Sequence, residues 1–477
     1  KYPYYKDEGK VWRQGVNSDK YLTQEQKLNQ YWTYNVKDTS RTLDVWWALE
    51  KEMEDLKVRK VHDFIMEKYM PMATYMTCKG MKYNKQKQGQ MALQYDKEIK
   101  SLADDMIATY NLPENINFNS VAQIKQLFYD NWGMKAKINR KTKSVTVDDT
   151  ALKTLSREYP RHAPFINSLQ ELRAKRKLRS TYLSLDTAEL DGRIHFGYKI
   201  VGTVFGRWSS GQSPFGDGTN GQNIPDITRC MIEAEEGYTF INADLSQAEA
   251  RIVAMLGQEM ALLAVFESGQ DIHAQNADNI FKCGLDHVHD EFANGKSYRD
   301  IGKRVVHASN YDMSAFTFAQ QTGLKKKEAQ KCLSAYFEMY PGIKRYHRWV
   351  QTELKAKRML ETPYGRKIQF FGRMNDQTFK AGYSCIPQST VGDILNHGAY
   401  NVFTEIPEVQ IGLPVHDSIL VSCPDDLVSS VIERMRKCMT IPITINGITH
   451  TIPVDFQVGK NWGKKKDYNP DGLEELR

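Results

Sequence analysis

The chain has 477 residues, of which 41% are hydrophobic and 26% are charged. This length predicts two to four domains with substantial cores, and this composition excludes a chain that is disordered throughout. The 65 Lys and Arg residues exceed the 58 Asp and Glu residues by only 7 charges. So mild an excess neither establishes nor excludes a nucleic-acid partner, because the placement of the charges decides.

Several classes of protein are disfavoured at this stage. The seven cysteines include no Cys-x-x-Cys pair, which argues against a disulfide framework and a structural zinc site. No stretch approaches the roughly 18 consecutive apolar residues of a membrane span, so we expect no membrane partner. The chain starts with Lys1-Tyr-Pro-Tyr-Tyr5, which lacks both Met and an apolar signal, so we expect a processed or truncated chain.

Helical periodicity dominates the first part of the chain, and we expect helices over 40–76, 98–110 and 150–185. A basic, β-leaning segment lies between the last two, over 135–147. Within the third helix, residues 173–179 carry five positive charges. A solvated helix face and a phosphate-tracking surface are equally good explanations for that run.

From residue 191 onward, strands and glycine-rich turns replace the helices. A buried strand is expected over 238–244, and helices are expected to dominate from 246 to 358. The remainder combines a helix near 389–405 with hairpins, one of them over 409–421.

Two carboxylates interrupt apolar strands in this second part. Asp244 ends the strand over 238–244, where capping of the next helix by Asp244 or Ser246 is the simpler explanation. Asp417 lies in a hairpin between Val, Ile and Leu residues, where a charge requires a compensating partner. Two such carboxylates fit a pair of divalent ions for phosphoryl transfer, and their hard oxygens favour Mg²⁺ over zinc.

Four polar residues recur at a spacing of four, which places them on one face of a helix: Arg299, Lys303, His307 and Tyr311. A solvated face opposite apolar residues is one explanation. The other is a clamp for a triphosphate, which must be built from side chains because the sequence contains no phosphate-binding Gly-rich P-loop.

Together these segments resemble the family A DNA polymerases, the bacterial polymerase I and phage replicative group. The segment from Asp244 to Arg251 resembles motif A, the stripe from Arg299 to Tyr311 resembles motif B, and Val415-His416-Asp417-Ser418 resembles motif C. Matching segments also occur at 178–182, 203–207, 222–225 and 387–390. The resemblance runs in order from about residue 40 to the end. It implies an α+β fold with a right-hand architecture, in which an antiparallel-sheet palm carries a largely helical thumb and fingers.

The resemblance also implies a division of the chain. The expected parts are a remnant of a 3′–5′ exonuclease domain (1–50), an entry to the palm (51–90), the thumb (91–190), the palm with motif A (191–255), the fingers with motif B (256–372) and the palm with motif C (373–477).

The implied activity is that of a DNA-directed DNA polymerase, which adds dNTPs to a primer 3′-hydroxyl by two-metal-ion nucleotidyl transfer and releases pyrophosphate. The expected context is phage or bacterial DNA replication, in the cytoplasm of a bacterium or a phage-infected cell. Expected partners are primer–template DNA, dNTPs, and a processivity factor or a separate exonuclease-containing chain.

The motifs imply a role for each residue. Asp244, Asp417 and the backbone carbonyl of Leu245 would hold two Mg²⁺ ions, and Lys303 would be the acid for the leaving group. The residues implied to bind the nucleotide are Arg299, Lys303, His273, His307, Tyr311, Glu249 and Gln247. The residues implied to contact DNA are Arg207, Asn223, Arg229, Arg179, Gln388 and His416. Glu249 with Tyr311 resembles the steric gate that excludes a ribose 2′-hydroxyl.

The sequence departs from the family pattern at three positions. His307 stands where Phe or Tyr is usual, which puts the selection against dideoxynucleotides in question. Asp312 replaces a common Gly, for which the sequence offers no explanation. Ser418 replaces the Glu of bacterial members and hints at a phage-type enzyme.

Near the amino end, Tyr34-Asn-Val-Lys-Asp38 resembles the last motif of the family's exonuclease domain, although an ordinary helix start explains it too. No counterpart of that domain's Asp-x-Glu segment precedes it, so we expect no 3′–5′ exonuclease activity from this chain alone. Two alternative functions stay open. A single-subunit RNA polymerase is disfavoured by the pairing of Glu249 with Tyr311, and a non-catalytic scaffold is disfavoured by the intact motifs.

Overall fold

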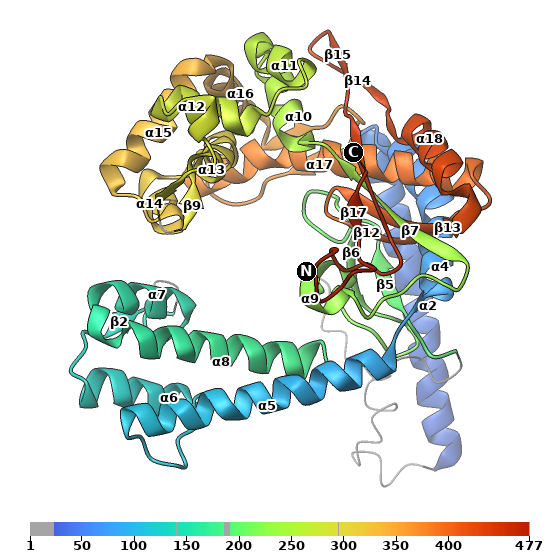
Figure 1. Ribbon diagram of the computed structural model, residues 1–477. Coiled ribbons are helices and arrows are strands. Elements are labelled where there is room, and N and C mark those ends of the chain that lie inside the picture. The colour runs from blue at the N-terminus through green and yellow to red at the C-terminus, as the bar shows by residue number, and fades with distance from the viewer. Residues whose placement is uncertain (1–22, 140–141, 186–190, 294, 477) are drawn as a thin grey trace.

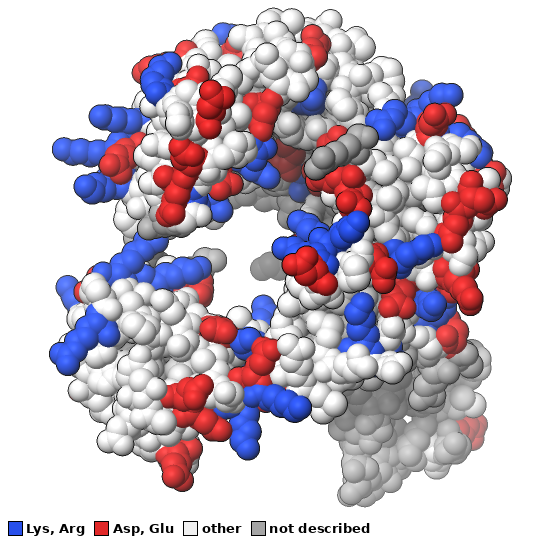
Figure 2. All heavy atoms as spheres, viewed as in Figure 1, with Lys and Arg blue, Asp and Glu red and all other residues white. Residues whose placement is uncertain are grey.

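The computed structural model describes residues 23–139, 142–185, 191–293 and 295–476. A sheet-containing lobe and two helical lobes surround a central opening (Figures 1 and 2). The first 22 residues of the expected exonuclease remnant lie outside the described residues, as do 140–141 and 186–190 of the expected thumb. None of the described helices is both long and apolar enough to cross a membrane.

The sheet of the first lobe is antiparallel, with the strand order β12-β13-β7-β16-β17. Its strands are β7 (Tyr238–Leu245), β12 (Gln410–Val415), β13 (Ser418–Pro424), β16 (Val454–Gly459) and β17 (Glu474–Glu475). Helices α17 (Asp376–Glu405) and α18 (Val428–Met439) pack against β13. Because β13 is buried along nearly its whole length, its apolar residues do not alternate with exposed polar ones, and its two serines are buried as well.

Short elements complete this lobe. Two-stranded ribbons pair β1 (Met81–Lys82) with β4 (Arg193–Ile194), β5 (Phe196–Lys199) with β6 (Ser209–Gln212), and β14 (Pro442–Ile445) with β15 (Ile448–Thr451). A 3₁₀ turn, η5 (Gly221–Asn223), and the short helix α9 (Asp226–Arg229) follow β6.

The upper helical lobe contains the segment expected to form the fingers (Figure 1). Its helices are α10 (Ala248–Leu256), α11 (Met260–Glu267), α12 (Ile272–Phe281), α13 (Tyr298–Asn310), α14 (Ala315–Thr322), α15 (Lys326–Met339) and α16 (Pro341–Lys357). The ribbon of β8 (Glu291–Ala293) and β9 (Lys296–Ser297) lies between α12 and α13, and the ribbon of β10 (Met359–Glu361) and β11 (Lys367–Gln369) follows α16. One large buried cluster joins this lobe to the sheet.

The lower helical lobe contains the segment expected to form the thumb. Two long helices, α5 (Lys85–Tyr110) and α8 (Ala163–Thr181), lie side by side and carry a tip (Figure 1). The tip consists of α6 (Val121–Lys125), a π-helical turn (Gln126–Asn131), the ribbon β2 (Lys137–Ile138) with β3 (Val145–Thr146), and α7 (Asp149–Glu158). Phe118, Phe128 and Phe165 centre a separate core here, so this lobe packs as a unit of its own.

The amino-terminal helices differ from the sequence prediction of one helix over 40–76. Helix α2 (Gln24–Asp55) ends just before Lys57, whose backbone is left-handed with φ of 58°. Helix α3 (Arg59–Phe64), a π-helical turn and α4 (Met70–Lys79) then follow. The apolar residues of α2 also remain largely exposed, with Trp32 at 55% and Trp47 at 58%. Their periodicity therefore predicted a helix correctly but does not mark a core contact.

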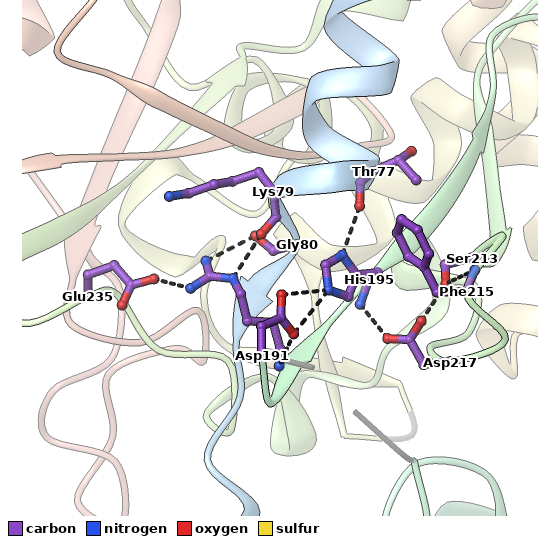
Figure 3. Close-up of polar contacts among 10 residues, drawn as sticks. Thr77, Lys79, Gly80, Asp191, His195, Ser213, Phe215, Asp217 and Glu235 are labelled. Atoms are coloured by element: carbon purple, nitrogen blue, oxygen red, sulfur yellow. Dashed lines mark hydrogen bonds and ion pairs between the residues drawn. The ribbon is translucent and has the colours of Figure 1, made fainter. Parts of the chain in front are cut away.

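A polar cluster braces the base of the lower lobe against the sheet lobe (Figure 3). The Nδ1 atom of His195 lies 2.8 Å from the Thr77 carbonyl, and its Nε2 atom lies 3.1 Å from Asp191. The His195 backbone N–H donates to Asp217 at 3.0 Å, and Arg193 donates to two carbonyls at the end of α4. Because the chain leaves for α5 just after α4 and returns just before β4, the cluster holds both crossing segments.

Candidate active site

The carboxylates of motifs A and C meet on two neighbouring strands. Ser418 of β13 pairs with Asp244 of β7, which places Asp417 beside Asp244. The backbone N–H of Leu245 donates to the carbonyl of Asp417 at 3.0 Å. The hairpin turn before Asp417 is tight because His416 adopts a left-handed conformation, with φ of 57°. The structure thus brings together two carboxylates that lie far apart in the sequence.

A third carboxylate, Asp455, lies on the other side of Asp244, and the sequence prediction missed it. It belongs to β16 and pairs directly with Asp244 of β7. Directly paired residues of an antiparallel sheet point to the same face, so both carboxylates face the cleft. The sequence signal was an acidic residue inside the apolar run Ile452-Pro-Val-Asp455-Phe, which is the same signal that singled out Asp417.

The raised pKa values of Asp244 and Asp417 are typical of a site that binds a cation. Burial, followed by repulsion from Asp417 and Asp455, raises the pKa of Asp244 to about 7 although Lys303 opposes the shift. Burial also raises the pKa of Asp417, and Glu249 adds to the effect. Placing negative charge here without a counter-ion is unfavourable, so a divalent cation fits the group.

The coordination that this protein offers is sparse. Among the described residues, no group of three or more His, Cys, Asp or Glu side chains converges on one point. An ion at this site would be held by Asp244, Asp417, the carbonyl of Leu245 and water. That donor set is typical of Mg²⁺, which prefers oxygen ligands and keeps several waters, and it does not suit zinc.

Helix α13 presents the cationic stripe to the same cleft. A reciprocal cap between Ser297 and Asp300 starts the helix, and its apolar face is buried in the core of the upper lobe. Gly302 lies against α12, where a Cβ atom would come within 2.5 Å of the His273 carbonyl. This close approach determines how far α13 stands from α12 and turns Lys303 toward the cleft, whose lining includes it.

Arg299 is held by a partner that the sequence prediction missed. Its Nε atom donates to Asp271 at 2.5 Å, and Asp271 also accepts from the backbone of His273 as the cap of α12. The pKa of Asp271 is lowered because these hydrogen bonds outweigh the effect of its burial. An Asp followed by a helical pattern was the available signal, but capping alone explained it.

His273 lies in the cleft as expected, but it carries no positive charge at neutral pH. Burial, together with the neighbouring charges of Arg299 and Lys303, lowers the pKa of His273 to about 4. Its Nδ1 atom is buried and has no hydrogen-bond partner among the described residues. His273 is therefore placed to bind a nucleotide through a hydrogen bond from its uncharged ring.

Glu249 bridges the two lobes. One of its carboxylate oxygens pairs with Arg207, and the other accepts a hydrogen bond from the hydroxyl of Tyr311. Burial and the Glu249 charge hold the pKa of Tyr311 well above its ordinary value, so this hydroxyl stays a donor. The ring of His307 meets Tyr311 edge-on, with a centroid distance of 5.0 Å.

These residues line one cleft of about 620 Å³ between the sheet and α13. The expected site residues in its lining are Asp244, Leu245, Gln247, Glu249, His273, Arg299, Lys303, His307, Tyr311 and Asp417. The Oε1 atom of Gln247 is buried there without a hydrogen-bond partner among the described residues. The structure thus assembles the expected catalytic and nucleotide-binding residues in one place.

The residues expected to contact DNA divide into two groups. Arg207 lies beside the cleft, where its Nε atom donates to the Gln388 carbonyl at 3.2 Å. Asn223 ends η5, and His416 is exposed at the hairpin turn. Two others already have partners away from the cleft lining. Arg179 pairs with Asp96 of α5 at 2.9 Å, and Arg229 stacks on Trp462 with its guanidinium carbon 4.3 Å from the ring centroid.

The structure explains Asp312, for which the sequence offered no reason. Asp312 adopts a left-handed conformation with φ of 52°, in which Gly is favoured and Asp is tolerated. Its carboxylate pairs with Lys344 of α16 at 3.3 Å. The side chain therefore compensates for the loss of Gly with a contact that a Gly lacks.

Comparisons with known proteins support the same fold. The DNA polymerase I of Chloroflexus aurantiacus is 27% identical over 460 residues, which are 90% of this chain and 46% of that protein. The DNA polymerase I of Pseudomonas aeruginosa is 28% identical over 389 residues, 76% of this chain and 41% of that protein. This chain thus spans less than half the length of these curated relatives.

A solved structure has the same architecture. The POL domain of Pol1 from M. smegmatis, in complex with DNA primer-template and dNTP, matches with a TM-score of 0.76 at 24% identity. The match covers 88% of this chain and 74% of that one, which confirms the α+β polymerase fold. The sequence profile of DNA polymerase family A matches residues 85–464. This chain belongs to DNA polymerase family A.

Proposed function

We propose that this chain is a template-directed DNA polymerase, which adds dNTPs to a primer 3′-hydroxyl and releases pyrophosphate. The observation that carries this proposal is the single cleft in which the carboxylates Asp244 and Asp417 face the cationic stripe of α13. Phosphoryl transfer requires positioning and charge stabilisation more than covalent chemistry, and the cleft offers groups for both.

The carboxylates act on the reacting ends of the two substrates. Asp244, Asp417 and the Leu245 carbonyl would hold two Mg²⁺ ions, whose chemistry when bound is to activate the primer hydroxyl and to neutralise the triphosphate. Asp244 must lose its proton to act as a ligand, because its pKa is about 7. Asp455 adds negative charge beside this group from β16.

The stripe of α13 acts on the triphosphate. Arg299 can bind a phosphate only by exchanging its contact with Asp271, so Asp271 keeps the guanidinium oriented until the substrate arrives. Lys303 is the candidate acid that protonates the departing pyrophosphate. His273 would supply a hydrogen bond without adding a charge, given its pKa of about 4.

The bridge through Glu249 acts on the sugar and on the primer end. The hydroxyl of Tyr311 donates a hydrogen bond to Glu249. A ribose 2′-hydroxyl beside them would therefore meet a carboxylate oxygen that already accepts a hydrogen bond. Arg207, which pairs with the same carboxylate, would reach the minor groove together with Gln388, Asn223 and His416. Minor-groove acceptors are nearly the same for all base pairs, so these contacts would test the shape of a pair rather than its sequence.

We also propose the biological setting. The relatives named above are bacterial proteins, which supports the cytoplasm of a bacterium, and Ser418 supports a phage-type enzyme in an infected cell. A processivity factor or a separate exonuclease-containing chain is proposed as a partner. The exposed tryptophans of α2 support a protein contact there, because Trp32 lies just before the segment from Tyr34 to Asp38 and Trp46 and Trp47 lie after it.

Primer extension tests the proposal. The purified chain should extend a primer with Mg²⁺ and dNTPs but not with rNTPs, and Asp244→Asn and Asp417→Asn should each abolish extension. Asp38→Asn on α2 is the matched control and should extend as the unmodified chain does. Extension with rNTPs would indicate an RNA polymerase instead, and DNA binding without any extension would indicate a scaffold. A mismatched primer should keep its 3′ nucleotide.

A further inference from the structure

A second polar cleft lies where the thumb tip meets the fingers. It has a volume of about 850 Å³ and is formed by α7 and α8 on one side and by β9, α13 and α14 on the other. Arg157 of α7 closes it by donating to the Gln320 carbonyl of α14 at 3.1 Å. In Figure 2, Lys and Arg side chains gather where the upper and lower lobes approach each other at the left. We call this the thumb–fingers cleft.

Its cations outnumber its anions, and three of its four cations form no ion pair in the described part of the chain. Arg157, Lys296 and Arg304 line the cleft and form no ion pair with any described residue. The one acidic residue of the lining is Asp149, which already pairs with Lys153 at 2.6 Å and accepts from Gln170 at 2.6 Å. The charge of Asp300 on α13 opposes their repulsion in part, but Asp300 forms no ion pair with any of the three in the described structure.

Lys296 lies close enough to the other two cations for their charges to act on it. Burial, and then the charges of Arg304 and Arg157, lower the pKa of Lys296. Its Nζ atom donates to the Gln321 carbonyl at 2.8 Å, which satisfies one hydrogen bond but adds no negative charge. Like charges held together are destabilising unless an anion enters between them, so the cleft favours an anionic occupant.

The rest of the lining indicates which anion. It contains hydroxyl and amide side chains and no large apolar one: Thr150, Thr154, Ser156, Asn167, Gln170, Thr317, Gln320 and Gln321. Protein partners and apolar ligands need aromatic or aliphatic anchors, which the lining lacks. Hydroxyl, amide and guanidinium groups are the usual contacts of nucleic-acid phosphates and sugars.

The position of the cleft selects single-stranded nucleic acid. Arg304 follows Lys303 on α13, so the thumb–fingers cleft lies on the adjoining face of the helix that carries the nucleotide clamp. Pockets of about 300–1,000 Å³ hold ligands of small-molecule size, which corresponds to a few nucleotides of one strand and not to a duplex. We propose that this cleft binds the phosphodiester backbone of the unpaired template ahead of the primer end. The proposal rests on the proposed polymerase function.

Equilibrium binding across a salt series tests it. The substrates are one labelled primer–template duplex with a blunt end and the same duplex with a ten-nucleotide 5′ template overhang. The variants are Arg157→Gln, Lys296→Gln, Arg304→Gln and their triple combination, and Lys331→Gln on the outer helix α15 is the charge-matched control. Inorganic tripolyphosphate serves as the competitor that reports a site for free polyphosphate.

We expect the variants to weaken binding of the overhang substrate only. Each lost cation should reduce the slope of log K against log salt by about 0.7, so the triple variant should lose about 2. Blunt-end binding, the Lys331→Gln control and extension across a one-nucleotide overhang should stay unchanged. An equal loss on both substrates, an unchanged slope, or displacement by tripolyphosphate at the same charge concentration as DNA would each overturn the proposal. Loss of extension on every substrate would instead count against the polymerase function.

Discussion

Asp455 of β16 lies directly opposite Asp244 of β7, although 211 residues separate them in the chain. Asp417, in the turn just before β13, flanks the pair on its other side, so three carboxylates stand at one end of the cleft. Each of the other two raises the pKa of Asp244 beyond the effect of burial. The sheet register alone creates this arrangement, and it has consequences for stability.

We predict that the metal-free protein loses stability as the pH rises from about 4 to above 7. Asp244 has an ordinary pKa of 3.8 when unfolded and a pKa of about 7 when folded. Between these values the folded state holds a proton that the unfolded state has released, so the free energy of unfolding falls as the pH rises. Asp455→Asn should reduce this fall, by up to about 1.4 kcal/mol for each unit by which the pKa of Asp244 drops.

Urea unfolding at pH 5, 6, 7 and 8 in the presence of a chelator measures this effect. Asp455→Glu, which keeps the charge, is the control and should retain the pH dependence of the unmodified chain. An unchanged pH dependence in Asp455→Asn would show that Asp455 does not act on Asp244.

A buried ion pair between Arg366 and Asp393 is predicted to position Arg207. The pair spans 2.7 Å with both side chains largely buried. A Cβ atom on Gly206 would meet the Arg366 guanidinium at 2.7 Å, so this ion pair determines the turn that carries Arg207. Asp393→Asn should cost about 3–5 kcal/mol of stability, because it leaves a buried charge without compensation.

The matched variant is the double substitution Arg366→Met with Asp393→Leu. It should recover most of the stability, since apolar residues replace buried ion pairs well, but it should still bind primer–template several-fold more weakly. Thermal unfolding and DNA titration separate the two effects. Recovery of both stability and DNA affinity would contradict a positioning role for the pair.

Gly80→Ala is predicted to loosen the base of the thumb. Gly80 has φ of 58°, and a Cβ atom there would come within 2.6 Å of the His195 ring. With ψ of −173°, this backbone conformation is essentially restricted to Gly and costs another residue about 1–3 kcal/mol. Displacement of His195 would also break its contacts to Thr77 and Asp191. Hydrogen exchange should accelerate at 77–84 and 191–195.

Gly89→Ala on helix α5 is the control for this prediction. A Cβ atom on Gly89 meets nothing within 4 Å. Because Ala is a better helix former, the substitution should add up to about 1 kcal/mol of stability. Equal effects of the two Gly substitutions would mean that the His195 contacts do not brace the thumb.

His307→Tyr is predicted to change the ratio of dideoxynucleotide to deoxynucleotide incorporation several-fold. His307 lines the cleft and meets Tyr311 edge-on, so its side chain is placed to sense the sugar of an incoming nucleotide. Competition between ddNTPs and dNTPs in primer extension measures the ratio. His307→Phe separates the effect of the ring from that of the tyrosine hydroxyl. Identical ratios in all three proteins would remove His307 from sugar selection.

Much of the site could be predicted from the sequence because its signals are local. The spacing of Arg299, Lys303 and His307 places them on one face of any helix, whatever surrounds it. Short apolar runs likewise predicted the strand that leads to Asp244 and the hairpin at Asp417. These signals predicted which residues gather, and family resemblance supplied the roles that we propose for them.

The remaining features depend on contacts between distant segments. Asp455 joins the group through sheet register, Asp271 orients Arg299 across two helices, and Lys344 stabilises the left-handed Asp312 from α16. Arg179 was expected to contact DNA, yet Asp96 of α5 pairs with it in the described structure. The sequence around a charged residue does not show whether its partner will be a residue of a neighbouring helix or a ligand. Its pKa, its orientation and its availability are therefore decided only when the fold brings the partner to it.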